Sequence, residues 1–191
     1  MELYGIKTLE FWSKHDLSGV VFPAAVKVDS DKVLHKTDKQ GLILGIKNRA
    51  ELDEAIQKIE GNFSGENFIV QPMQKIQTEI IIGIKKDDIF GPIVVFGLGG
   101  IYTEVFKMVD FLVPPASLEE IKSKLKESKL RFLFEETRGQ KPYGLEETAE
   151  ILHGISVLAQ EISEIKELDI NPLLVYNDGR SGVAIDVKII I

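Results

Sequence analysis

The chain has 191 residues and a formal charge of −7, because 30 acidic side chains outnumber 23 basic ones. No stretch is strongly basic, which argues against nucleic acid as the main partner, since proteins of that class cluster Lys and Arg against phosphates. The absence of cysteine excludes disulfide bonds and thiolate zinc sites. Apolar residues make up 44% of the chain, as in an ordinary globular protein.

The first residues and the apolar runs bear on location. Residues 1–5 lack a basic region followed by an apolar core, so we expect no signal peptide. No apolar run approaches the roughly 20 residues that a membrane-spanning helix needs. We therefore expect a cytoplasmic protein that does not insert into a membrane.

The first part of the chain predicts three strands around one helix. The strands are expected at residues 20–28, 42–47 and 68–70. Pro23 marks an edge or an irregular start of the first strand, because proline cannot donate to a strand ladder. Asn48 is a suitable N-cap for a helix in which Leu52, Ile56 and Ile59 share one face.

The rest of the chain predicts hairpins and two more helices. Strands are expected at residues 80–82, 93–96, 106–113, 165–176 and 183–191, with the first two antiparallel neighbours. Ser117 and Glu120 form a capping-box pattern that begins a helix, and residues 146–163 show helical apolar spacing. This order predicts an α+β fold dominated by antiparallel hairpins.

The C-terminal hairpin carries a polar face. Glu167, Asp169 and Asn171 alternate with Leu168 and Ile170, so a strand places the three polar groups together. The simplest interpretation is an amphipathic hairpin whose polar face meets water, and the pattern alone favours it.

The turn geometry adds a second interpretation of this hairpin. A two-residue turn at Asp178 and Gly179 puts Asn171 directly opposite Asp186. An amide oxygen and a carboxylate at that separation can share a hard cation such as Mg²⁺, which takes few protein oxygens. The inference depends on register, because a slip of one residue moves Asp186 to the other face.

Three further features suit phosphate chemistry, although each has an ordinary alternative. Gly97, Gly99 and Gly100 end a strand, where backbone N–H groups can approach phosphate oxygens or simply form a turn. Lys27 interrupts an apolar strand, so it faces either solvent or an anion in a cleft. His35 lies in a polar segment, which is a loop or the location of a phosphoryl-accepting imidazole.

Taken together and in order, these segments resemble the ATP-grasp subunit of ADP-forming acetyl-CoA synthetases and related acyl-CoA synthetases. The matching stretches read AVKV, HKTDKQGLILGIKN, VQPM, TEIIIGIKKDDIFGPIVVFGLGGIYTEVFKMV, TRG, ELDINPLLV and AIDVKI. The resemblance implies one ATP-grasp domain over residues 1–191, with a smaller lobe at about 1–69 and a larger one at about 70–191. It also implies clamping of ATP or ADP, with Mg²⁺, between antiparallel sheets.

The resemblance assigns roles to individual residues. His35, within HKTD, is implied as the phosphoryl carrier and Asp169 as its contact, with Asn171 and Asp186 holding magnesium. Nucleotide contacts are implied for Lys27 with the phosphates, Gln71, Pro72 and Met73 beside adenine, Glu79 near the ribose or phosphates, and Gly99 and Gly100 as backbone donors. Arg138 is implied as a phosphate contact or a partner-facing group.

The chain departs from the family pattern in ways that leave alternatives open. Residues 7–22 are shortened, and Gln40 stands where the family has a second glycine before Gly41. Nothing resembles the CoA-binding or ligase domains, so we expect a separate α-type subunit to supply them. The alternatives are a non-catalytic nucleotide-binding module and an ATP-grasp ligase that forms acyl phosphates without His35.

Overall fold

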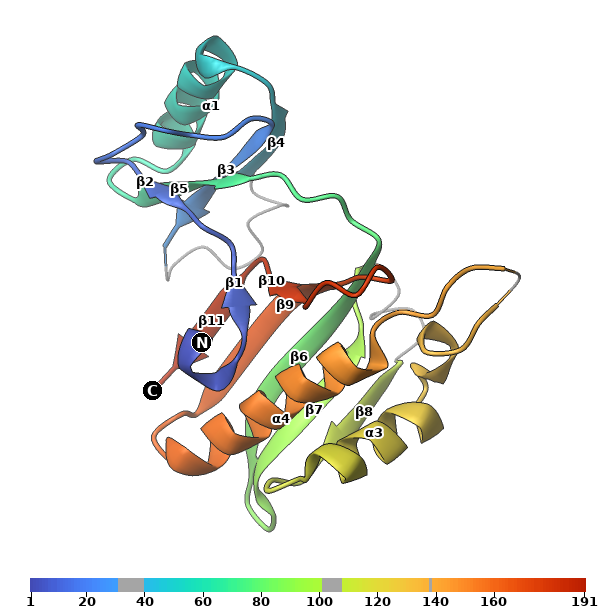
Figure 1. Ribbon diagram of the computed structural model, residues 1–191. Helices are drawn as coiled ribbons and strands as arrows, with labels where there is room; N and C mark the ends of the chain where they lie inside the picture. The colour runs from blue at the N-terminus through green and yellow to red at the C-terminus, as the bar shows by residue number, and fades with distance from the viewer. Residues whose placement is uncertain (31–39, 101–107, 138) are drawn as a thin grey trace. The chain divides into compact units, whose positions relative to one another are not determined.

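The computed structural model describes residues 1–30, 40–100, 108–137 and 139–191 (Figure 1). The chain divides into two compact units, a larger one of Met1–Thr8 and Ile76–Ile191 and a smaller one of Leu9–Lys75. The resemblance predicted a lobe boundary near residue 69 and grouped residues 1–8 with the smaller lobe. In the structure the first eight residues pack with the larger unit, and the chain passes between units after Lys75.

The smaller unit is a four-stranded sheet with one helix. The sheet has the order β2-β5-β3-β4, and its cross-strand pairs are antiparallel. Its elements are β2 (Trp12–Ser13), β3 (Ala24–Asp29), β4 (Leu42–Ile46), α1 (Arg49–Asn62) and β5 (Asn67–Pro72). The Asn48 side chain accepts the Glu51 N–H at 3.0 Å, which confirms the predicted N-cap. Helix α1 packs against β3 and β4 and buries Leu52 and Ile59 in the core of this unit, as its spacing predicted.

The larger unit is a seven-stranded sheet in the described residues, with order β1-β10-β9-β6-β7-β8 and β11 also paired to β9. Its strands are β1 (Lys7–Thr8), β6 (Thr78–Asp87), β7 (Gly91–Leu98), β8 (Val109–Leu112), β9 (Glu167–Val175), β10 (Val183–Ala184) and β11 (Val187–Ile190). Its helical segments are η1 (Glu2–Tyr4), α3 (Leu118–Glu127), η2 (Arg131–Leu133) and α4 (Leu145–Glu161). The predicted α+β fold with antiparallel sheets is confirmed.

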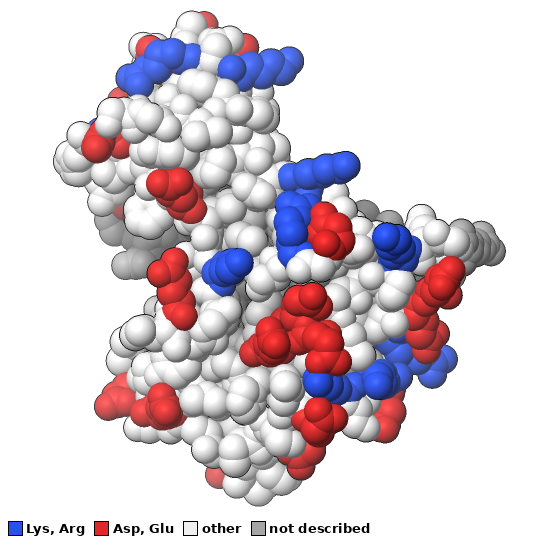
Figure 2. Space-filling view, in the orientation of Figure 1, with Lys and Arg blue, Asp and Glu red and all other residues white. Residues whose placement is uncertain are grey.

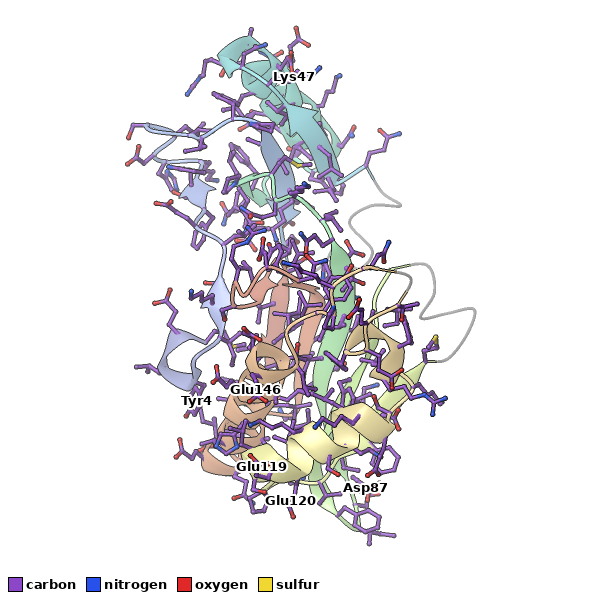
Figure 3. All side chains as sticks on the ribbon, turned by 45° about the vertical axis from the view of Figure 1, so that its right-hand side comes forward. Tyr4, Lys47, Asp87, Glu119, Glu120 and Glu146 are labelled. Atoms are coloured by element: carbon purple, nitrogen blue, oxygen red, sulfur yellow. The ribbon has the colours of Figure 1, made fainter. Side chains whose placement is uncertain are left out.

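One predicted strand is confirmed with a shifted start, another is interrupted, and one predicted helix start is confirmed. The strand expected from residue 20 begins only at Ala24, because Pro23 has no N–H to donate to a ladder. The last predicted strand is split into β10 and β11, since Ile185 and Asp186 leave the regular ladder between them. The capping box of Ser117 and Glu120 is present at the start of α3, where Figure 3 labels Glu120.

Helices α3 and α4 lie across one face of the larger sheet (Figure 1), and this face holds the main core. Ile80, Ile82 and Ile84 alternate along β6 and are all buried there, so the residues between them face away from the helices. The N-terminal segment is packed on α4 closely enough that a Cβ on Gly154 would meet the Tyr4 carbonyl oxygen. This contact explains why residues 1–8 belong to the larger unit.

Two observations bear on partners. No helix within the described ranges is long and apolar enough to cross a membrane. On the face drawn in Figure 2, basic and acidic side chains are interspersed, and the described residues form no continuous basic patch there.

Candidate nucleotide and metal site

The C-terminal hairpin has the predicted register. Val183 pairs with Leu174 above the break, and Val187 pairs with Ile170 below it, so the two halves are in the same register. At the break, the Asn171 N–H donates to the Asp186 carbonyl oxygen at 3.0 Å, which puts these residues opposite each other. The predicted juxtaposition of Asn171 and Asp186 is therefore confirmed, and their role toward a metal remains a prediction.

The polar face of β9 is also as predicted. Leu168 and Ile170 are buried in the core, whereas Glu167, Asp169 and Asn171 are exposed. The pairing places Lys188 directly opposite Asp169 and Ile190 opposite Glu167. One face of the hairpin therefore carries two carboxylates and an amide, with a third carboxylate contributed by Asp186 near its break.

The charges on this face act on one another. Burial raises the pKa of Asp169 above its ordinary value, the negative charges of Glu167 and Asp186 raise it further, and Lys85 and Lys188 offset part of the shift. Repulsion among neighbouring carboxylates is relieved when a cation binds between them. The negative charges of Asp169 and Asp186 therefore repel each other, and a cation bound between them would reduce that repulsion.

The donor set fits magnesium better than a metal that needs a complete protein cage. Among the described residues, no group of three or more His, Cys, Asp or Glu side chains is arranged to hold an ion. Asn171 and Asp186 supply an amide and a carboxylate, both hard oxygen donors. Magnesium is commonly bound by one or two such groups and completes its shell with water and phosphate oxygens. The described residues are compatible with that mode.

Glu79 and the glycine pair meet at one end of β6 and β7. The Gly99 N–H donates to the Glu79 carbonyl oxygen at 2.8 Å. A Cβ on Gly99 would lie 3.0 Å from the Glu79 Cβ, and one on Gly100 would lie 3.2 Å from the Glu79 carboxylate. Gly100 also has a φ of +70°, which favours glycine. Side chains at either position would displace Glu79, which accounts for both glycines locally.

The strand pairing puts the polar residues of β9 and the cluster of Glu79 with its two glycines on one face of the larger sheet. Gly83 lies directly opposite Asp169, and it alternates along β6 with buried isoleucines, as does Glu79. Glu79, Gly99, Asp169 and Asn171 therefore share the face turned away from α3 and α4. Three segments that are distant in the sequence are brought together by this sheet.

The remaining predicted nucleotide contacts lie in the smaller unit. Lys27 pairs with Ile69 and Ala25 with Gln71, so Lys27 and Gln71 are diagonal neighbours on one face of that sheet. They retain only 7% and 8% of their surface exposed. Pro72 pairs with Ala24, and the Met73 N–H donates to the Pro23 carbonyl oxygen at 2.8 Å. The solvent-facing alternative for Lys27 is therefore excluded by its burial.

Two predicted residues lie outside the described residues. These are His35, predicted as the phosphoryl carrier, and Arg138, predicted as a phosphate or partner contact. Their roles remain predictions from the resemblance alone.

The structure also shows a pocket that the sequence patterns did not indicate. It has a volume of about 730 Å³ and lies entirely within the larger unit, beside Glu79. Its lining consists of Ile76, Gln77, Thr78, Glu79, Leu98, Gly99, Gly100, Met108, Phe132 and Leu133. Phe132 and Leu133 belong to the short segment η2, which has no apolar periodicity to identify it. Only their proximity in the fold relates them to Glu79.

Comparison with known proteins identifies the family of this chain. A family model described as an ATP-grasp domain matches residues 2–191. The chain belongs to the ATP-grasp family. The predicted family is therefore confirmed.

Individual ATP-grasp relatives narrow the resemblance. The chain is 35% identical to the β subunit of the ADP-forming acetate–CoA ligase I of Pyrococcus furiosus, over all of this chain and 88% of that subunit. It is 34% identical to the ADP-forming 4-hydroxybutyrate–CoA ligase of Nitrosopumilus maritimus, over 88% of this chain but 25% of that protein. The chain thus corresponds to most of a β subunit in one organism and to a quarter of a longer ligase in another.

A solved structure gives the same family assignment. The dinucleotide-forming acetyl-coenzyme A synthetase 1 of Ca. Korarchaeum cryptofilum is 31% identical and superposes with a TM-score of 0.87, covering 100% of this chain and 87% of that one. It was solved with coenzyme A and Mg-AMPPCP, its phosphohistidine segment pointing towards the nucleotide binding site. The ATP-grasp chain described above therefore has the fold of an ADP-forming acetyl-CoA synthetase subunit.

Proposed function

We propose that this chain is the nucleotide- and magnesium-binding subunit of an ADP-forming acyl-CoA ligase. In this role it transfers a phosphoryl group between a phosphohistidine at His35 and ADP or ATP. The observation that carries the proposal is the shared sheet face of Glu79, Gly99, Asp169 and Asn171, with Asp186 in register opposite Asn171. The similarity to two β subunits of acetate–CoA ligases, of which the chain covers 88% and 75%, supports the reaction class.

Each residue has a role that its environment supports. Lys27 is a buried cation and supplies positive charge to a nucleotide phosphate. Asn171 and Asp186 hold Mg²⁺, which when bound neutralises charge on the phosphate oxygens. Gly99 and Gly100 leave room for a close approach to the backbone. The protein need only align donor and acceptor and neutralise charge, because phosphoryl transfer requires little else.

The proposed phosphoryl transfer passes through a phosphohistidine intermediate. The neutral imidazole of His35 attacks the γ-phosphorus of ATP, a P–N bond forms, the bond to the β–γ bridging oxygen breaks, and ADP leaves. The reverse step makes ATP from a phosphohistidine. Covalent transfer splits one difficult reaction into two easier ones. Asp169 lies on the same sheet face as Glu79 and Asn171. We propose that it contacts the phosphorylated imidazole.

Thioester formation requires a partner in this proposal. The chain spans a quarter of the 4-hydroxybutyrate–CoA ligase of N. maritimus, and it corresponds to most of a β subunit of the acetate–CoA ligase of P. furiosus. We propose that an α-type subunit supplies the CoA-binding and acyl-transferring parts. Without it, the chain exchanges phosphoryl groups with nucleotide but makes no acyl-CoA.

The test is phosphorylation of the full chain by ATP labelled in the γ-phosphate, with magnesium. We expect an acid-labile, base-stable label that is lost in His35→Ala. His15→Ala is the matched control, because His15 is an exposed histidine of the same unit whose side chain no proposal uses. Nucleotide binding without any label would overturn the transfer and favour the non-catalytic module. Acyl phosphate formation that survives His35→Ala would favour the direct ligase.

A further inference from the structure

Two lysines flank Asp169 on the sheet face turned away from α3 and α4, and the family resemblance assigns a role to neither. Lys188 lies directly opposite Asp169 on β11. On the other side, Lys85 lies opposite Glu167 on β6, which makes it a diagonal neighbour of Asp169. Opposed residues of antiparallel strands have Cβ atoms about 4.5–5.5 Å apart, and long side chains also reach diagonal neighbours. Asp169 is therefore bracketed by a cation on each side.

Both lysines have ammonium groups that are available to a ligand. Their side chains are exposed, and both act electrostatically on the Asp169 carboxylate. Within the part of the chain that the structure describes, neither Lys85 nor Lys188 has a hydrogen bond or an ion pair. The next lysine along β6 differs, because the Lys86 Nζ donates to the Ser163 carbonyl oxygen at 2.9 Å. The ammonium donors beside Asp169 are therefore free to bind an anionic group.

The sheet leaves space for a ligand beside the Asp169 carboxylate. Its directly opposed residue on β6 is Gly83, which has no side chain. Among the described residues, a Cβ built on Gly83 would meet only the Leu168 carbonyl oxygen within 4 Å, at 3.2 Å. The β6 side of Asp169 is therefore open above the sheet, so a ligand can approach the carboxylate between the two ammonium groups.

The charges on this face select the chemistry of the ligand. Glu167 and Asp169 alone would repel an anion, and the two lysines balance their negative charges. A phosphoryl group is anionic and has strongly accepting oxygens, so it suits the ammonium donors. When one nitrogen of an imidazole is phosphorylated, the N–H on the other nitrogen remains, and a carboxylate can accept it. A phosphorylated imidazole thus matches both kinds of group, whereas a free carboxylic acid substrate offers only an anion.

We propose that Lys85 and Lys188 bind the phosphoryl oxygens of the phosphohistidine, while Asp169 accepts the N–H of its imidazole. The inference rests on the proposed phosphoryl transfer through His35, and it adds two cationic residues to that step. Without their charges, Glu167 and Asp169 repel the phosphoryl group. The two lysines therefore act on the phosphorylated carrier and leave the binding of Mg-ADP unchanged.

The experiment measures the rate at which the full chain takes label from γ-labelled Mg-ATP, and the affinity of the same proteins for Mg-ADP by calorimetric titration. Lys85→Met and Lys188→Met are each expected to slow labelling about threefold, and the double variant about tenfold, with ADP affinity unchanged. Lys86→Met is the matched control, because Lys86 is an adjacent exposed lysine that donates to Ser163 instead. Lys85→Arg and Lys188→Arg keep the charge and are expected to retain most of the rate.

Salt dependence provides a readout that a loss of stability would not imitate. At saturating Mg-ATP, wild-type labelling is expected to slow as ionic strength rises, because salt screens exposed charges, and the double variant is expected to lose most of this dependence. The inference is overturned if the double variant is labelled at the wild-type rate. It is also overturned if ADP affinity falls as much as the rate, since the lysines would then act on the nucleotide.

Failure of this inference is distinct from failure of the proposed function. If wild type takes label at His35 and the double variant does so at the same rate, only the role of the two lysines is wrong. If wild type binds Mg-ADP but takes no label, the phosphoryl transfer and the role of the lysines are both overturned.

Discussion

The two units carry opposite charges at their predicted site residues. The smaller unit contributes Lys27, the one charged side chain that is buried among the described residues. The larger unit contributes a partly exposed set of carboxylates, in which the pKa of Asp169 is raised by burial and by its acidic neighbours. Nucleotide phosphates are anions that a lysine can bind, whereas carboxylates bind cations such as Mg²⁺. The predicted site residues of the two units are therefore suited to groups of opposite charge.

The largest effect is expected from removing the buried cation. In Lys27→Met the apolar stem is kept and the charge is lost, so Mg-ADP affinity is expected to fall about 10- to 100-fold, because hydrogen bonds to charged groups contribute about 1.5–3 kcal/mol. Calorimetric titration measures it. Lys47→Met, an exposed lysine of the same unit, serves as the control. Equal affinities of Lys27→Met and wild type would contradict a phosphate role for Lys27.

A smaller effect is expected from neutralising a carboxylate of the larger unit. In Asp186→Asn one anionic donor becomes neutral, so the magnesium concentration required for ADP binding is expected to rise about tenfold, or ~1.4 kcal/mol. Titration of magnesium at fixed ADP measures the shift, with Asp88→Asn as the control on an exposed hairpin tip. An unchanged magnesium requirement would leave the hairpin as an amphipathic surface and remove the proposed metal site.

The smallest effect concerns Asp169 and stability in the absence of metal. Because its folded pKa lies above the ordinary value of 3.8, the folded state binds the proton more tightly, and the resulting stability is present below pH 3.8 and lost as pH rises through the folded pKa. Asp169→Asn is therefore expected to be more stable than wild type at pH 7, by less than about 1 kcal/mol since the group is exposed.

The two proteins are expected to converge in their pH dependence below pH 3.8. Urea unfolding across this pH range, with EDTA present, measures the difference. Glu167→Gln is the companion variant, because it removes one of the charges that raise the pKa of Asp169 and should reproduce part of the gain. A stability difference that does not change with pH would mean that the charge of Asp169 is not its origin.

Local signals in the sequence were sufficient to predict most of the helices and strands. The Asn48 cap, the Ser117 and Glu120 capping box and the alternation along β9 each depend on residues a few positions apart, and each is present in the structure. The register of the C-terminal hairpin was predicted correctly, although β9 ends at Val175 and β10 begins at Val183, so a longer loop stands where the prediction assumed a two-residue turn. The start of β3 at Ala24 was less accurately predicted, since apolar residues before Pro23 resemble a strand.

The tertiary structure decided what no local pattern contains. Burial of Lys27, the approach of Gly99 to Glu79 and the pocket with Phe132 all arise from contacts between segments that are far apart in the chain. By itself the sequence determined the family, the hairpins and the opposition of Asn171 and Asp186, because those depend on spacing. Only the fold specifies strand order and packing. These decide which polar groups share a sheet face and which apolar residues line a cavity beside them.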